Sequence, residues 1–354
     1  MDRKSGVLLA AVLAAACALL LFPAEAAQGA RNGVNYSLNI LVPSLYPFMV
    51  LSVFIVKSGL AEKLGRALEK PTQALFRLPG GAAASIVMSV VGGYPAGARS
   101  AAALFEAGLV TQAQAERMMY FCVNAGPSFL VTAVGVGFLH SAQAGAVLFA
   151  SQLVSFFAVG IFSGIFCRRE PEPAGRQKKA APAGTAQALI DSAADAAYST
   201  LMMCCFVILF ATGMNLLRGA IPVPALSVAC SAALEVTGGC ADLARAGAPL
   251  WVFALAVGWS GVCVHLQVLA CLGGVKIRRG RFVFCRLVQG AVSAAVCFGL
   301  SPLCSPSAET FTNTDAVFSA STSGPAPAAA ALAVLCVALL FCMPHEGLEI
   351  DDAK

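Results

Sequence analysis

Four short polar segments interrupt apolar stretches of the chain. They cover residues 92–99, 122–128, 234–240 and 258–267, and each combines glycine or proline with polar side chains. Glycine and proline end helices, and the first turn of the next half-helix then leaves backbone N–H groups free, which attract anions. The segments at 92–99 and 234–240 each interrupt a short apolar run, and those at 122–128 and 258–267 each interrupt a longer helix. Because this pair of features occurs twice, we interpret the four segments as parts of one transport site.

The candidate substrate-binding residues lie in these four segments. They are Tyr94, Pro95, Gly97 and Arg99; Asn124, Gly126 and Ser128; Glu235, Thr237 and Gly239; and Ser260, His265 and Gln267. An ionisable group within a membrane segment is by default a functional hypothesis. Glu235 therefore either holds a coupled proton or cation, or is a structural partner for a nearby arginine, or lies at the membrane interface.

Two further candidates also keep alternatives open. Arg99 either faces an anionic substrate or extends to the inner surface. His265 is either a proton relay or a packing residue. Gln267 follows two positions later, so it does not share a helix face with His265.

Several functions are not expected. We find no metalloprotease, Walker or G-x-S-x-G motif, so no catalytic residues are assigned and the chain is not expected to be an enzyme. The 14 cysteines are scattered through apolar runs without metal-ligand spacing, which predicts small buried side chains and neither a metal nor a cofactor. The net charge of +5 comes from short clusters between apolar segments and does not indicate a nucleic-acid partner.

Composition places the chain in the membrane. Of its 354 residues, 58% are hydrophobic and 12% are charged, with a mean hydropathy of +0.80. A soluble domain has about twice that charged fraction. We predict an all-α, polytopic membrane protein in the bacterial cell membrane, with membrane lipid as one partner.

Basic clusters set the topology. Residues 57–77, 167–185 and 276–281 carry most of the Lys and Arg, and the positive-inside rule places them on the inner side. The runs at 81–108 and 225–246 each consist of two short segments, with return helices expected at 98–107 and 241–246. A segment of about ten residues is about 15 Å long and too short to cross. If both are re-entrant helical hairpins, all three clusters lie inside. The spans at 34–56 and 197–217 then run in opposite directions, so the two halves form inverted repeats.

The same reasoning divides the chain. Ala24-Glu25-Ala26 resembles a signal-peptidase site, so the first segment is either a retained anchor or a cleaved signal, and we favour a retained helix. The expected parts are an anchor or signal at 1–28, a first repeat at 33–166, a basic, proline-containing linker at 167–187, a second repeat at 188–301, a polar loop at 302–327 and a last membrane helix at 328–344.

The ordered motifs resemble a known family. They are Gly92-Gly93-Tyr94-Pro95-Ala96-Gly97-Ala98, Phe121-Cys122-x-Asn124-x-Gly126-Pro127, Leu234-Glu235-Val236-Thr237 with Gly239, and Gly258-Trp259-Ser260-Gly261 with His265-x-Gln267. They are similar to the sporulation integral membrane protein YlbJ (SpoVV) family, of the Gate or nucleoside-recognition superfamily, over about residues 33–300. Val123, Ala125 and Gly238 depart from the family's pattern, which has Asn, Ser and Asn there.

The resemblance implies a function. Members occur in endospore formers and are thought to move dipicolinic acid across the outer forespore membrane. The expected function is therefore transport of a small anionic solute without ATP. The alternatives are a permease for nucleosides or another small solute, and a non-transporting membrane scaffold for spore assembly. A homo-oligomer is compatible with each of them.

Overall fold

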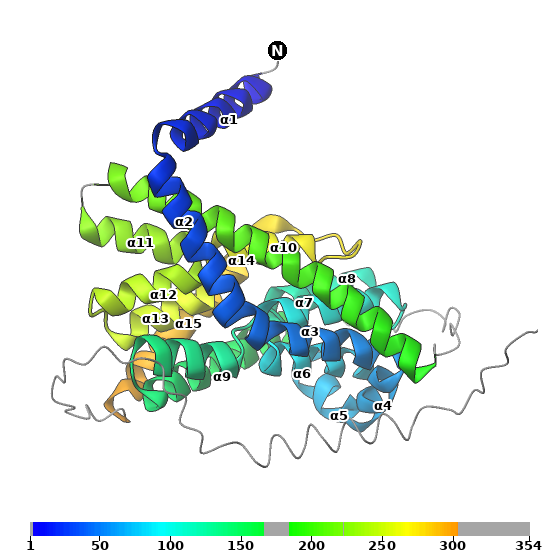
Figure 1. Ribbon diagram of the computed structural model, residues 1–354. Helices are drawn as coiled ribbons and strands as arrows, with labels where there is room; N and C mark the ends of the chain where they lie inside the picture. The colour runs from blue at the N-terminus through cyan, green and yellow to red at the C-terminus, as the bar shows by residue number, and fades with distance from the viewer. Residues whose placement is uncertain (1–2, 166–183, 222, 304–354) are drawn as a thin grey trace, which may run out of the picture.

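Helices make up the part of the chain that the structure describes. This computed structural model describes residues 3–165, 184–221 and 223–303, and these residues contain no strand (Figure 1). Four helices are long and apolar enough to cross a membrane, or up to seven if each of three bent pairs is one span. The prediction of an all-α, polytopic membrane protein is confirmed. Most of the expected basic linker, most of the polar loop and the last membrane helix lie outside the described residues.

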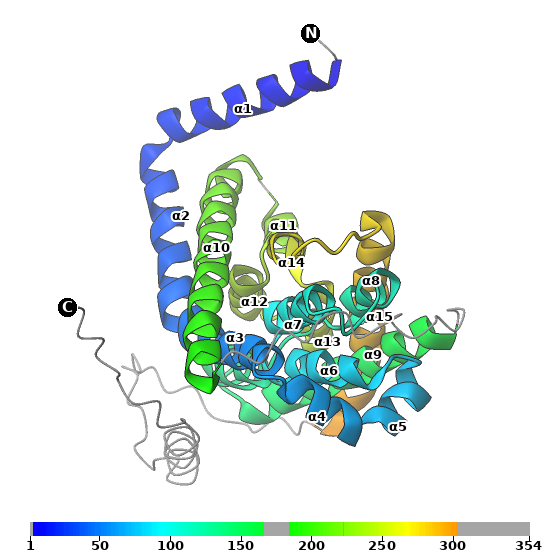
Figure 2. The same cartoon turned by 90° about the vertical axis from the view of Figure 1, so that its right-hand side faces the viewer.

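The N-terminal helices change direction twice. Helix α1 (Arg3–Leu21) meets α2 (Pro23–Tyr36) at a 97° bend, and α2 continues through η1 (Ser37–Leu41) into α3 (Val42–Lys57). Figure 2 shows α2 and α3 running in different directions. The span predicted at 34–56 is therefore divided between two helices. Pro43 lies at the junction, where it removes a backbone hydrogen bond.

Helix α2 packs closely along α10 (Thr185–Ala220). A Cβ atom added to Gly33 would lie 2.6 Å from the Cα of Ile208, and one added to Gly29 would lie 2.7 Å from the Cα of Thr212. Small residues one helical turn apart allow such close contact between membrane helices.

A short helical segment lies between α3 and the first hairpin. It comprises α4 (Leu60–Ala67), α5 (Glu69–Pro71), η2 (Thr72–Phe76) and η3 (Gly80–Ala82). In α4, Ala61 and Gly65 are buried while Lys63 and Arg66 are exposed, as the helical spacing of its apolar residues predicts.

The first hairpin consists of α6 (Ala83–Val91) and α7 (Tyr94–Glu106), joined by two glycines. A Cβ atom on Gly81 would lie 3.6 Å from the carbonyl oxygen of Leu109, so the two ends of the hairpin meet at its base. Helix α7 starts four residues earlier than the sequence analysis expected, because Pro95 suits the first turn of a helix. Gly97, which the sequence placed at the tip, therefore lies inside α7, together with Arg99.

An interrupted helix follows the first hairpin. It comprises α8 (Gln112–Phe121) and η4 (Ser128–Phe138), and α9 (Ala142–Ile165) comes next. A capping box starts α8: Gln114 N–H donates to Thr111 Oγ1 over 3.2 Å, and Thr111 N–H donates to Gln114 Oε1 over 2.9 Å.

The second half repeats the order of elements. After α10 come the hairpin of α11 (Pro224–Leu234) and α12 (Val236–Arg245), then an interrupted helix of α13 (Leu250–Trp259) and α14 (Gly261–Ala270), then α15 (Arg279–Leu300) and η5 (Ser301–Leu303). Helix α12 begins at Val236, whereas the sequence analysis expected the return helix to begin at Ala241. Gly239 fits inside this helix because it packs against Ala232; an added Cβ atom would lie 2.4 Å from the Ala232 Cα.

Several contacts of the first half have counterparts in the second. Helix α7 contacts α14 while α12 contacts η4, and α8 contacts α15 while α13 contacts α9. In the first hairpin, the guanidinium of Arg99 in the middle of α7 pairs with Asp195 of α10 and with Glu106 at the hairpin base. In the second hairpin, Asp242 in the last turn of α12 pairs with Arg218 of α10. Asp195 and Arg218 are separated along α10 by about 35 Å, at about 1.5 Å per residue. The two hairpins are therefore held by ion pairs at well-separated points of α10.

Candidate functional site

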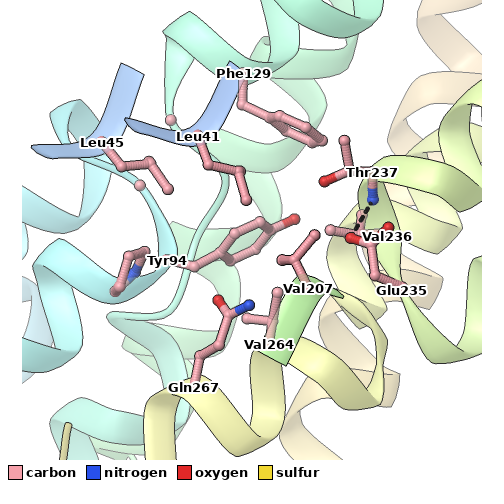
Figure 3. Close-up of a pocket in the computed structure, with 13 residues that line it drawn as sticks. Leu41, Leu45, Tyr94, Phe129, Val207, Glu235, Val236, Thr237, Val264 and Gln267 are labelled. Carbon is pink, nitrogen blue, oxygen red and sulfur yellow. Dashed lines mark hydrogen bonds between the residues drawn. The ribbon is translucent and has the colours of Figure 1, made fainter. Parts of the chain in front are cut away.

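The two hairpin tips and the two interrupted helices converge on one cavity (Figure 3). The first half contributes Leu41, Leu45, Gly93, Tyr94, Pro95, Gly126 and Phe129. The second half contributes Val207, Glu235, Val236, Thr237, Val264 and Gln267. The cavity volume of about 20 Å³ is near the minimum for a single water molecule. The site is therefore closed in this conformation.

Each hairpin tip touches the interruption of the helix that follows it. A Cβ atom on Gly93 would lie 3.2 Å from the backbone nitrogen of Gly126. In the second half, a Cβ atom on Gly261 would lie 3.1 Å from both the Leu234 carbonyl oxygen and the Val236 nitrogen. Gly93 and Gly261 both have positive φ angles, of 89° and 75°, which favour glycine. The same backbone contact thus occurs on both sides of the cavity.

Tyr94 joins the two halves. Its hydroxyl donates to the carbonyl oxygen of Val257 in α13 over 2.6 Å, and its ring lies in the middle of the lining side chains (Figure 3). Because the side chain is buried, this hydrogen bond fixes the tip of the first hairpin against the second half.

Glu235 caps the N-terminus of α12. The backbone N–H groups of Thr237 and Gly238 donate to its two carboxylate oxygens over 2.8 and 2.6 Å. A carboxylate at this position is stabilised by the free N–H groups and by the helix dipole. Glu235 therefore occupies the anion-binding end of α12, and none of the arginines within residues 3–165, 184–221 and 223–303 is bonded to it. The N-terminus of α7 has no side-chain cap.

Of the sequence-predicted candidates, Tyr94, Pro95, Gly126, Glu235, Thr237 and Gln267 line this cavity. The others have different surroundings. Gly97 and Gly239 are close-packing positions, and Ser260 donates to the neighbouring Trp259 carbonyl. Ser128 is partly buried at the start of η4 and is not among the lining residues.

Arg99 and His265 lie away from the cavity. Arg99 pairs with Asp195 over 3.2 Å and with Glu106 over 3.5 Å, which links α7 to α10. The Nε2 atom of His265 lies 3.0 Å from the Trp259 carbonyl oxygen, and its ring packs edge-on against Trp259 and Phe282. Since a carbonyl only accepts hydrogen bonds, Nε2 carries the proton. In this structure each side chain has a structural role.

Asn124 belongs to a buried polar cluster that the sequence analysis missed. Its Oδ1 accepts from Gln289 over 3.1 Å, and the guanidinium of Arg286 donates to the carbonyl oxygens of Tyr120 and Val123. These carbonyl groups lie at the end of α8, where intrahelical donors run out. Arg286 is fully buried in α15. The sequence signal for this cluster was an arginine within the apolar run at 282–300.

Among the described residues, no three His, Cys, Asp or Glu side chains are grouped as metal ligands.

Comparison with known proteins supplies a relative. The sporulation integral membrane protein YlbJ of Bacillus subtilis (strain 168) is 26% identical over 313 residues, covering 77% of this chain and 76% of the relative. This similarity supports the assignment of the chain to the YlbJ family. YlbJ is described as an integral membrane protein, which agrees with the membrane-spanning helices found here, so this chain is a multi-pass integral membrane protein. No protein-family model matches the chain. No solved structure matches it.

Proposed function

We propose that this chain transports a small anionic solute, and that the solute is dipicolinic acid exported across the outer forespore membrane during sporulation. The observation that carries the proposal is the convergence of two hairpin tips and two interrupted helices on one cavity. Interrupted helices with free backbone groups form substrate sites in secondary transporters. Membership of a family whose relative is a sporulation membrane protein supports the biological setting.

The two halves are proposed to be inverted repeats. This is supported by the matched contacts of the halves and by the separation of about 35 Å along α10 between the residues that pair with the two hairpins. A bilayer core is about 30 Å thick. Each hairpin then enters from its own side of the membrane, and the tips meet near the middle. Rocking of one half against the other would expose the closed cavity to either side.

The lining of the cavity suits an aromatic anion. Apolar side chains, including Leu41, Phe129 and Val264, surround the ring of Tyr94, while Gln267 provides a polar amide. The uncapped N-terminus of α7 supplies N–H groups for a carboxylate. Dipicolinate combines a pyridine ring with two carboxylates and matches both features.

Glu235 is proposed to hold the coupled proton. A carboxylate beside an anionic solute repels it, and protonation removes this repulsion. The buried position of Glu235 in the cavity wall supports such a role. Capping of α12 by Glu235 and binding of the solute in the cavity would then depend on each other.

Uptake into proteoliposomes tests the proposal. Purified chain should take up labelled dipicolinate, and Gln267→Ala and Glu235→Gln should each reduce the initial rate about tenfold or more. Gln187→Ala and Glu62→Gln are the matched controls, because both side chains are exposed outside the cavity. Unchanged rates in both cavity variants would refute the site.

The alternatives make different predictions in the same assay. A nucleoside permease would take up labelled uridine or adenosine, and dipicolinate would not compete. A membrane scaffold would take up neither solute, although the protein would still be folded and monodisperse after reconstitution.

A further inference from the structure

A second, larger cavity lies next to Glu235, between α2, α10, α11 and α12. Its volume is about 120 Å³, compared with about 20 Å³ for the closed cavity between the hairpin tips. Its polar lining includes Asn32 and Tyr36 from α2, Asn215 and Arg218 from α10, and Arg245 from α12. Glu235 lines both cavities and separates them.

The charges around this outer cavity favour an anion. Asp242 is shared by two arginines: Arg218 is bonded to its Oδ2 atom, and Arg245 Nη1 lies 2.7 Å from its Oδ1 atom. The Asp242 side chain is 8% exposed, whereas those of Arg218 and Arg245 are 41% and 65% exposed. Each guanidinium has five N–H donors, and one carboxylate uses only a few of them.

Glu235 is the acidic residue among those that line this cavity. Its two oxygens accept from the N–H groups of Thr237 and Gly238, so they are directed at the start of α12. The positive end of that helix offsets part of its charge. The accessible arginine donors are therefore the strongest electrostatic feature that the outer cavity presents to a solute.

We propose that this outer cavity is a docking site for a carboxylate-bearing anion on the transport path, on the side of the membrane opposite the basic loops. This inference rests on the proposed function. Arg218 and Arg245 bind one carboxylate of the solute, and Asn215 and Asn32 supply further hydrogen bonds. The solute then passes Glu235 to reach the closed cavity, which becomes large enough only when the halves move.

Position supports the assignment. The outer cavity lies at the Arg218 end of α10, and the ion pairs of Asp195 with Lys57 and Arg99 lie about 35 Å away along the same helix. Lys57 and Arg99 belong to the inner side by the positive-inside rule. A solute at Arg218 is thus held at the outer end of the bundle. It docks there before it passes inward, or, in export, before it is released.

Two substitutions with opposite expected effects test the site. Equilibrium binding of labelled dipicolinate to the purified full-length chain is measured in neutral detergent. Arg218→Gln should weaken binding about tenfold, because a charge-assisted hydrogen bond is lost. Asp242→Asn should tighten binding about threefold, because it removes an opposing charge from a partly solvated site. Arg31→Gln, an exposed arginine on α2 outside the cavity, should leave binding unchanged.

The opposite signs separate a docking site from a structural ion pair. If both substitutions weaken binding, or if neither changes it, the site is overturned. Should Arg218→Gln fail to fold, Asn215→Leu replaces it and should also weaken binding. Binding of phosphatidylglycerol that is lost in Arg218→Gln, with no saturable binding of dipicolinate, would assign the cavity to a lipid headgroup and overturn the proposal.

Flux measurements distinguish this inference from the proposed function. If wild-type protein transports dipicolinate but Arg218→Gln and Asp242→Asn bind it normally, the outer site fails while the transport function stands. If wild-type protein binds dipicolinate with the expected effects of both substitutions but shows no flux, the transport function fails while the docking site stands.

Discussion

Gly93 and Gly126 meet backbone to backbone at the tip of the first hairpin. A Cβ atom on Gly93 would lie 3.2 Å from the Gly126 nitrogen, and one on Gly126 would lie 3.1 Å from the Gly93 nitrogen. Gly93 also has a φ of 89°. Two glycines are required here because the tip and the interrupted helix share one narrow space, and this contact forms one wall of the cavity.

Replacing Gly93 should therefore be costly. Gly93→Ala combines a strained backbone with a steric contact and should lower the free energy of unfolding by about 1–3 kcal/mol. Gly213→Ala in α10 is the control, because nothing lies within 4 Å of its Cβ position. Thermal melting in detergent measures both. Equal melting temperatures for the two variants would contradict the backbone contact.

Arg286 should be essential for folding. Removing its guanidinium in Arg286→Gln leaves the buried carbonyl groups of Tyr120 and Val123 without donors, at about 1–3 kcal/mol for each. Arg286→Lys should not restore stability, because a single ammonium does not reproduce the planar fork. Monodisperse yield by size-exclusion chromatography is the measurement. The exposed Arg281→Gln serves as control, and normal yield of Arg286→Gln would be evidence against the buried contact.

His265 should act through packing and not as a proton relay. His265→Ala leaves the Trp259 carbonyl oxygen without this donor and removes ring contacts to Phe282, so it should cost about 2–4 kcal/mol of stability. His265→Gln, which keeps an N–H donor, should recover part of this loss and retain the wild-type dependence of transport rate on pH. A transport rate that loses its pH dependence in His265→Gln would instead support the relay.

Cysteine labelling should find the two hairpin bases on opposite sides of the membrane. Ala107→Cys lies at the base of the first hairpin and Ala246→Cys at the base of the second, and both positions are exposed. A membrane-impermeant thiol reagent should label position 246 in intact cells and position 107 only in inverted vesicles. The parent chain, with its native cysteines, gives the background signal. Labelling of both positions from one side would contradict the inverted arrangement.

Much of the architecture was predictable from local chemistry. Apolar length and low charge determined an all-α membrane protein, and glycine or proline marked three of the helix interruptions near the cavity. The fourth interruption, between α11 and α12, falls at Glu235. These signals are local: a proline or a glycine pair changes the backbone wherever it occurs. The starts of the two return helices were predicted less accurately. Both return helices begin earlier than expected, because Pro95 suits the first helical turn and the side chain of Glu235 caps the other helix.

Only the tertiary structure decided which candidates share the cavity. Tyr94, Glu235 and Gln267 converge there, whereas Arg99 and His265 turn towards partners on other helices. Spacing along one helix says which side chains share a face, but not which neighbour covers that face. The buried Arg286 and the outer cavity at Arg218 depend on contacts between residues far apart in the chain. Such contacts are set by the packing of whole helices, which no single segment of the sequence specifies.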